Sequence, residues 1–339
     1  MDSAFLDTYL LAFPPADCEL AELDSYVKNL LAWRNLIKSE AFPAYISSFA
    51  PTTLGELGGF PPWEAVLKNI QRLRPEEYYP GDVFAIIQYF LDRLPKIEDD
   101  LGIRDILLDE AVCDPSVAAT RPAPWGQVLE RLLGLICLFV QRNGQTGNHY
   151  VLTRGILPCP TTVNFGAKLV DVEWQPAWNS SDAEIPADLQ GSFRTFSCAK
   201  NWRIAIDPER LWLNTMSNET CNLAIELAVQ RMQRQTGQLN ARKWRVGGSF
   251  VASVSSLNLG TEERGRSILR AIAETLLDQN MRATHHIRTD QGANSLQLTR
   301  GKDGAWRRDI DHEYHLHYWV GEQIELAAIV AHNNFHIPA

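Results

Sequence analysis

The chain has 339 residues, 22% of them charged, and a formal net charge of −9. This length predicts about two domains and a core large enough to fold without disulfides or structural metals. The acidic balance argues against a protein coated in nucleic-acid-binding charge, while leaving room for a local basic groove. The longest apolar run, residues 132–140, is far shorter than the about twenty residues of a membrane helix. With no basic leader at its start and no Cys-x-x-Cys pair, the chain is expected in a reducing cytoplasm, off the membrane.

Residues 1–145 are predicted to form a helical domain. Apolar side chains recur at helical spacing over residues 21–39, and shorter segments of the same kind cover 63–73 and 83–94. The run 127–141 is the most apolar of these helices, so we expect it at the centre of this half. Prolines and glycines separate the segments.

Residues 146–339 are predicted to form a second domain of the α+β class. Helices are expected at residues 218–235 and 261–278, where Ser217 and Thr261 serve as N-caps. Strands are expected at residues 149–157, 169–174, 202–206, 246–256, 297–299, 309–320 and 323–331. The predicted fold is therefore a helical N-terminal half followed by a mostly antiparallel sheet with helices packed on it. The sheet should end in a β-hairpin over residues 310–332.

Histidine is concentrated near the C-terminus. All but one of the histidines fall in the last part of the chain, at His285, His286, His312, His315, His317, His332 and His336. Histidine titrates near neutral pH, so such clustering raises the odds of a reactive site.

The hairpin pattern predicts which of these side chains lie together. Gly321 suits the first position of a two-residue type II′ turn, which would place Leu326 opposite His317 and Ala328 opposite His315. The period-two alternation of a strand then gathers one set of side chains on one face. That set contains Asp311, Glu313, His315, His317 and Trp319, with His332 opposite Asp311.

Three chemistries fit this predicted face. The first is metal-free acid–base catalysis, in which His315 and His317 exchange protons and Glu313 orients a ring. Arginines would hold a phosphate; Arg308 is assigned to the catalytic set and Arg300, Arg307 and Arg288 to substrate binding. The second is a divalent metal such as zinc, for which histidine and carboxylate ligands are plentiful. The third is structural, with the histidines as satisfied polar groups of a covered strand.

These patterns predict a cytosolic phosphodiesterase or RNase-like effector, of a kind suited to a toxin or an antiviral defence system. The arginine-rich stretch from residue 230 to 308 favours a nucleic acid or another phosphate-bearing partner. The alternative is a noncatalytic binding or scaffold subunit of a multiprotein complex, with or without associated nucleic acid. The ten tryptophans favour a protein partner in either case.

Overall fold

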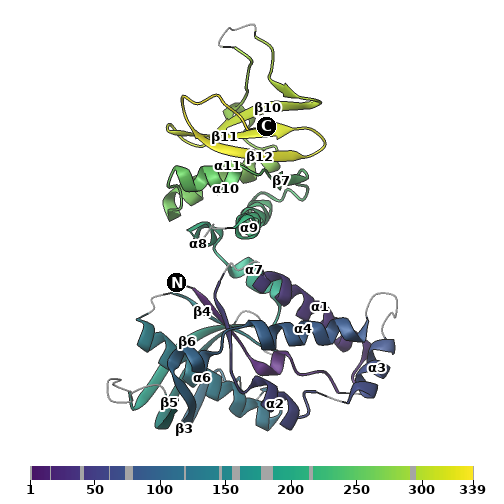
Figure 1. The fold of residues 1–339 in the computed structure, drawn as a ribbon, viewed down its shortest axis with the longest axis vertical. Coiled ribbons are helices and arrows are strands. Elements are labelled where there is room, and N and C mark those ends of the chain that lie inside the picture. The colour runs from purple at the N-terminus through teal and green to yellow at the C-terminus, as the bar shows by residue number, and fades with distance from the viewer. Residues whose placement is uncertain are drawn as a thin grey trace. The chain divides into compact units, whose positions relative to one another are not determined.

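The chain forms two compact units, each built around its own sheet (Figure 1). The computed structural model describes residues 2–15, 17–38, 42–60, 62–72, 79–117, 120–144, 147–154, 161–176, 186–213, 217–290 and 295–338. The first unit contains Met1–Lys38 and Phe42–Trp202, and the second contains Arg203–Ala339. The boundary expected at residues 145–146 therefore falls inside the first unit. It does so because the strand that follows it pairs with the first strand of the chain.

The sheet of the first unit is mixed. Its strands are β1 (Ser3–Leu6), β2 (Ala44–Ile46), β3 (Ile103–Asp114), β4 (His149–Leu152), β5 (Thr161–Trp174) and β6 (Asp188–Phe196), in the order β2-β1-β4-β6-β5-β3. β2, β1, β4 and β6 run parallel, whereas β5 is antiparallel to its neighbours β6 and β3. The parallel strands consequently end at one edge of the sheet. The expectation of a purely helical N-terminal half is corrected, because three of these strands lie before residue 145.

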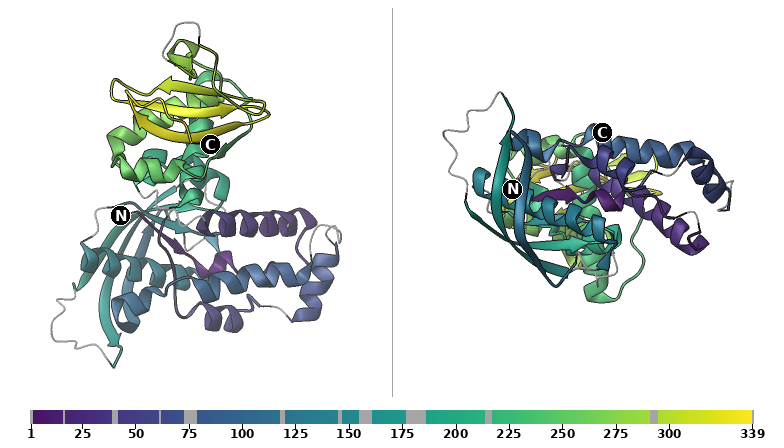
Figure 2. Two further views of the ribbon diagram at one scale, coloured as in Figure 1. Left: turned by 45° about the horizontal axis from the view of Figure 1, so that its top comes forward. Right: turned by 90° about the horizontal axis from the view of Figure 1, so that it is seen from below.

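Helices cover both faces of this sheet (Figure 2). They are α1 (Leu20–Lys38), α2 (Ala50–Glu56), α3 (Trp63–Arg72), α4 (Pro80–Arg93), α5 (Ile97–Leu101) and α6 (Ala123–Asn143). On one face, the rings of Trp33 in α1 and Tyr150 in β4 both contact the ring of Trp202. On the other face, Phe139 of α6 packs edge-on against Phe5. Among the described helices, α6 is long and apolar enough to cross a membrane, yet most of it is buried in the core of this unit.

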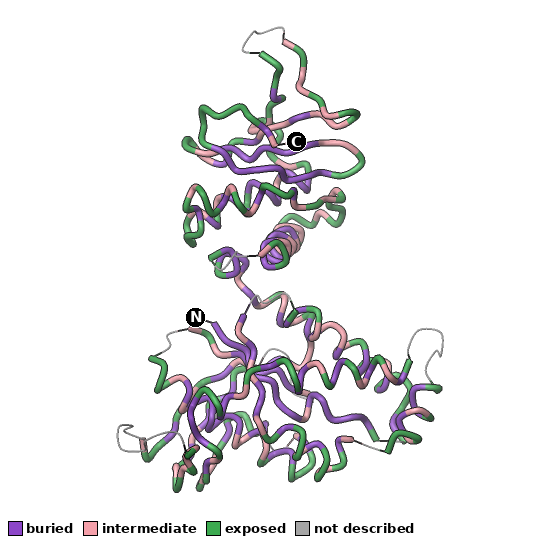
Figure 3. Tube along the Cα trace, in the orientation of Figure 1, coloured by how far each residue is buried: buried purple, intermediate pink, exposed green. Residues whose placement is uncertain are grey.

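The second unit stacks helices on one face of a mostly antiparallel sheet. Its strands are β7 (Trp244–Val246), β8 (Thr284–His286), β9 (Thr299–Arg300), β10 (Asp303–Asp309), β11 (Tyr314–Val320) and β12 (Ile324–Ala331). The order is β7-β12-β11-β10-β8, with β9 also on β10, and only the β7–β12 pair is parallel among the described strands. β11 and β12 are buried along most of their length (Figure 3). The prediction of mixed α and β structure is thus confirmed for the chain. The predicted antiparallel character of the sheet is found in the second unit.

The boundary between the two units lies within α7 (Ala199–Ala205). The helices of the second unit are α8 (Pro208–Leu213), α9 (Asn218–Thr236), α10 (Phe250–Ser256) and α11 (Glu262–Leu276), with a short 3-10 turn, η4, at Met281–Ala283. Two segments predicted as strands are helical instead. In the segment 202–206, the buried positions are Trp202 and Ile206, which lie one helical turn apart. In the segment 246–256, Phe250 and Val254 are buried at the same spacing.

The C-terminal hairpin exists, but its register differs from the prediction. The turn contains three residues rather than two, so Ile324 and not Gln323 pairs with Val320. A bulge between His317 and Tyr318 shifts the register once more. His317 therefore lies opposite Ala328 and His315 opposite Val330. One extra turn residue and one bulge are enough to move every cross-strand pair of a hairpin.

Candidate functional site

Titratable side chains gather on the face of the second sheet that lies away from α11. In the antiparallel pairs, Arg307 of β10 is directly opposite both His285 of β8 and His317 of β11, and Asp309 is opposite His315. Directly opposite residues of an antiparallel pair point to the same face. Three strands thus bring three histidines, one arginine and one aspartate together.

Asp309 lies between two of these histidines. Its Oδ1 is 3.0 Å from Nδ1 of His315, and its Oδ2 is 3.6 Å from Nε2 of His285. The distance between Asp309 and His315 is short enough for an ion pair. The two atoms are not aligned for a hydrogen bond, and both ring nitrogens of His315 therefore lack a hydrogen-bond partner among the described residues. On its other side, the ring of His315 is 4.5 Å from the ring of His332. Asp309 therefore occupies the place beside His315 that the sequence predicted for Glu313.

His315 and His317, the predicted catalytic pair, do share this face, with nearly parallel rings 6.5 Å apart. Both are buried beneath the C-terminal segment, with 1% and 0% exposure. Nδ1 of His317 donates to the carbonyl of His336 at 3.1 Å, so this ring is protonated on Nδ1 and its Nε2 has no partner among the described residues. The indole N–H of Trp319 donates to the carbonyl of Pro338, which also holds the C-terminal segment against this strand.

Burial governs the protonation of this pair. It lowers the pKa of His317 to about 4, because a charged imidazole would lose its hydration there. The positive charge of nearby Arg307 lowers this pKa as well. Burial also lowers the pKa of His315, although the carboxylate of Asp309 opposes the effect. Both rings are therefore neutral at neutral pH, and neither lines the open pocket described below.

Glu313 and Asp311 are engaged elsewhere. Arg264, near the start of α11, donates to Oδ2 of Asp311 at 2.8 Å and to Glu313. Oδ1 of Asp311 also accepts the backbone N–H of Tyr314 at 2.9 Å. These contacts fasten the turn between β10 and β11 to the helix layer. The geometry corrects the expectation that Glu313 orients the ring of His315 or His317, since its carboxylate contacts Arg264 and His312 instead.

The four predicted arginines separate into three environments. Arg308 is fully buried on the helix-facing side, where it donates to Glu274 at 2.7 Å and to the carbonyl of Gln279 at 2.6 Å. Arg300 donates to Glu325 at 2.7 Å. Neither of these two reaches the histidine face as a free cation. Arg288 and Arg307, in contrast, both line an open pocket.

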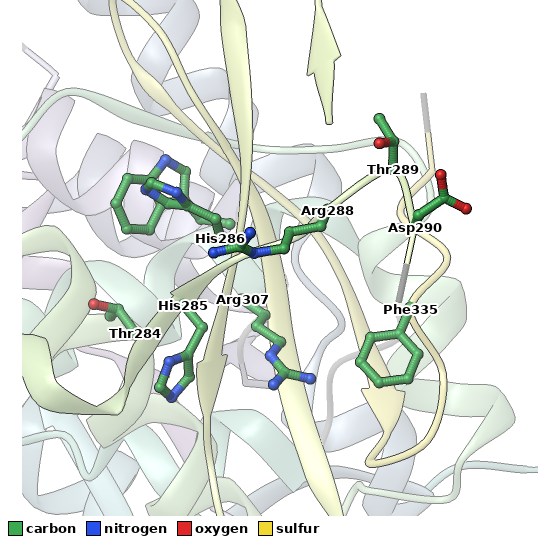
Figure 4. A pocket seen from close by; sticks show the side chains of 9 residues that line it. Thr284, His285, His286, Arg288, Thr289, Asp290, Arg307 and Phe335 are labelled. Atoms are coloured by element: carbon green, nitrogen blue, oxygen red, sulfur yellow. The ribbon is translucent and has the colours of Figure 1, made fainter. Parts of the chain in front are cut away.

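This pocket, of about 960 Å³, lies at the edge of the sheet formed by β8 (Figure 4). Its lining residues are Thr284, His285, His286, Arg288, Thr289, Asp290, Trp306, Arg307 and Phe335. His285 and Arg307 project side by side in this view. The guanidinium carbon of Arg307 is 5.2 Å from the ring centre of Phe335, and the ring of His286 packs edge-on against Trp306 at 4.0 Å. The pocket thus combines cations, imidazoles and aromatic faces.

Arg307 is distinctive within this lining. Its Nε is buried without a hydrogen-bond partner, and no carboxylate lies within ion-pair distance of it among the described residues. A cation in such a position has donors left for a ligand anion. The residues that sequence reasoning missed are His285 as a site residue, Asp309, Trp306 and Phe335. His285, Trp306 and Asp309 come together through the pairing of β8 with β10, which no local sequence pattern marks.

Comparison of the chain with protein-family models, with curated proteins and with solved structures gives no match. Among the described residues, no group of three or more His, Cys, Asp or Glu side chains is arranged to hold a metal ion.

Proposed function

We propose that the second unit binds single-stranded RNA in the β8–β10 pocket and cleaves it by acid–base chemistry at His285. The observation that carries the proposal is the guanidinium of Arg307, which has no carboxylate partner among the described residues and lies beside His285 and its partner Asp309. Arginine matches the geometry of a phosphate through two parallel hydrogen bonds. Arg288 adds a second cation to the same lining.

RNA fits the rest of the lining. Trp306 and Phe335 offer ring faces on which unpaired bases can stack, and Phe335 is half exposed. The exposed ring of His285 lies 3.6 Å from a carboxylate oxygen of Asp309, and imidazole is the side chain that most often serves as a general base. The net charge of −9 confines RNA contact to such a local cationic patch rather than to the whole surface.

The reaction needs no reagent besides the RNA. His285 takes the proton of the ribose 2′-hydroxyl, and the 2′ oxygen attacks the adjacent phosphorus. The bond from phosphorus to the 5′ oxygen breaks, and the proton passes to that leaving oxygen. The products are a 2′,3′-cyclic phosphate and a free 5′-hydroxyl. Arg307 would stabilise the negative charge that grows on the phosphoryl oxygens.

The test uses the full chain and a fluorescent single-stranded RNA of mixed sequence. Arg307→Gln is expected to weaken binding about 10- to 100-fold, the worth of a hydrogen bond to a charged group. It should also reduce the dependence of log affinity on log salt by about one phosphate contact. The matched control is Arg266→Gln, which removes the same charge from an exposed site on α11 and should change neither quantity.

Cleavage is followed in parallel, by mapping the ends of the products. His285→Ala is expected to slow it by about 10²- to 10⁴-fold while leaving binding nearly intact. Cyclic phosphate ends support the reaction above, and 5′-phosphate ends contradict it. Binding that depends on Arg307 without any cleavage would favour the noncatalytic alternative, and equal binding by wild type and Arg307→Gln would remove the pocket as the RNA site.

A further inference from the structure

The first unit carries a pocket of its own, at the edge where its parallel strands end. The cavity has a volume of about 230 Å³. Its lining comes from residues that follow three neighbouring strands, Leu10 after β1, Arg154 after β4 and Ser197 after β6, and from α1, including Glu22, Tyr26 and Asn29. All of these residues belong to the first unit, so this pocket is separate from the one at β8.

The position of this pocket in the sheet is informative. From β1 the chain passes through α1 to β2 on one side, whereas β4 and β6 lie on the other side of β1. α1 and α6 cover opposite faces, as the contacts of Trp33 and Phe139 show. The strand order therefore reverses between β1 and β4. In open sheets of parallel strands, the crevice outside the carboxyl ends at such a reversal is where ligands bind.

Arg154 provides the cation of this pocket. Its Nη2 donates to Glu22 at 2.6 Å, and its Nη1 donates to the carbonyl of Ala12 at 3.0 Å. The guanidinium carbon also lies 5.6 Å from the ring of Tyr9 and 5.5 Å from the ring of Tyr26. The arginine is thus fixed in place, while the Glu22 side chain is 49% exposed. A ligand phosphate can take the position that the Glu22 carboxylate now occupies.

The walls of the pocket are held by hydrogen bonds. The amide of Asn29 donates to the carbonyl of Ser197 at 2.9 Å and accepts the backbone N–H of Ala199 at 3.2 Å, which ties α1 to the end of β6. The hydroxyl of Tyr26 donates to the carbonyl of Leu11 at 2.8 Å. Preformed walls of this kind are typical of ligand pockets, because ordering them on binding would cost affinity.

A buried network next to this edge holds β1 and β4 in register. Asp7, directly after β1, accepts hydrogen bonds from Arg121 at 2.6 Å and from the hydroxyl of Thr153 at 2.5 Å. Arg121 also donates to that hydroxyl at 2.8 Å. The side chains of both ionic partners are fully buried. Arg154 follows Thr153 directly, so the network fixes the backbone from which the pocket cation projects.

The geometry points to a mononucleotide site at this edge, with Arg154 binding the phosphate. Leu10, Tyr26 and Leu30 line the cavity but are almost fully buried. The Asn29 amide is already bonded to Ser197 and Ala199, so Arg154 is the group that selects the ligand. The volume of about 230 Å³ lies below the range of about 300–1,000 Å³ of pockets that enclose a drug-sized ligand, so the phosphate and sugar of one nucleotide would occupy it and the base would remain at its open side. Glu22 acts as a competitor of the phosphate for Arg154.

Calorimetric titration of the full chain with AMP, GMP, CMP and UMP tests the assignment. Adenosine and inorganic phosphate are titrated as the two halves of the ligand. At least one mononucleotide is expected to bind more tightly than either half. Arg154→Ala should weaken that binding about 10- to 100-fold, and Arg154→Lys, which keeps the charge, should weaken it less. Glu22→Gln should instead tighten it several-fold, because it frees Arg154 and removes a negative charge.

Matched controls lie on the same helix. Asp24 and Lys28 form an exposed ion pair on α1 outside the pocket lining, so Asp24→Asn and Lys28→Ala should leave nucleotide affinity unchanged. Arg307→Gln should also leave it unchanged, which separates this site from the RNA pocket. The assignment is overturned if no mononucleotide binds at millimolar concentration, if phosphate alone binds as tightly, or if Glu22→Gln weakens binding. Circular dichroism checks that each variant is folded.

Discussion

Acidification should destabilise the C-terminal sheet through His317. The ring is fully buried, and its pKa falls from an ordinary 6.5 to about 4. In the unfolded chain the same ring takes up a proton as the pH falls below about 6.5, which favours unfolding. The stability that depends on the neutral ring is therefore complete above pH 6.5 and is lost as the pH falls towards 4. At about 1.4 kcal/mol per pKa unit, the loss amounts to about 3 kcal/mol.

Hydrogen exchange of the amides of β11 measures this loss where it occurs. The free energy of opening of that strand is compared at pH 7 and pH 4 in wild type and in His317→Asn, whose amide can still donate to the carbonyl of His336. The variant is expected to lose about 3 kcal/mol less than wild type over this interval. His312→Asn is the matched control, because the His312 side chain is 88% exposed. Retention of the full pH-dependent loss in His317→Asn would refute the reasoning.

Three further substitutions test the packing of the second unit, each by urea denaturation beside wild type. Arg308→Met should destabilise it by about 3 kcal/mol or more, because it leaves a largely buried carboxylate without its partner. Gly265→Ala should cost about 1–3 kcal/mol, since the new Cβ would lie 2.8 Å from the ring of Trp212. Ser217→Ala should cost about 1 kcal/mol, because the Ser217 hydroxyl accepts the N–H of Thr220 as the N-cap of α9. An unchanged midpoint in any of the three would contradict the corresponding contact.

The long helices could be predicted from sequence because their signal is repeated over several turns. α1, α9 and α11 span 15 to 19 residues and keep an apolar stripe throughout. β1 offers no comparable signal: it has only four residues, all of them buried, so neither alternation nor length marks it as a strand. β1, β2 and β3 are consequently strands that the sequence did not predict, and with them the parallel arrangement of the first sheet.

The candidate site was predicted in part for a similar reason. The alternation of residues along β11 places His315 and His317 on one face without knowledge of any neighbour. Their partners come from β8 and β10, and the choice of Asp309 over Glu313 depends on Arg264, which lies 49 residues before Glu313. Such pairings are set by tertiary contacts, which a single sequence does not display.

The arginine-rich stretch of the second unit acquires a different meaning in the structure. In sequence it favours a basic surface, yet Arg231, Arg245, Arg264, Arg266, Arg300 and Arg308 each lie within ion-pair distance of a carboxylate. Their charges are neutralised locally, which agrees with the acidic balance of the whole chain. Arg307 departs from this pattern, because no carboxylate among the described residues lies within ion-pair distance of it and the nearby Asp309 contacts His315 and His285 instead. An anion that enters the β8–β10 pocket would therefore meet a cation that the protein itself leaves unneutralised.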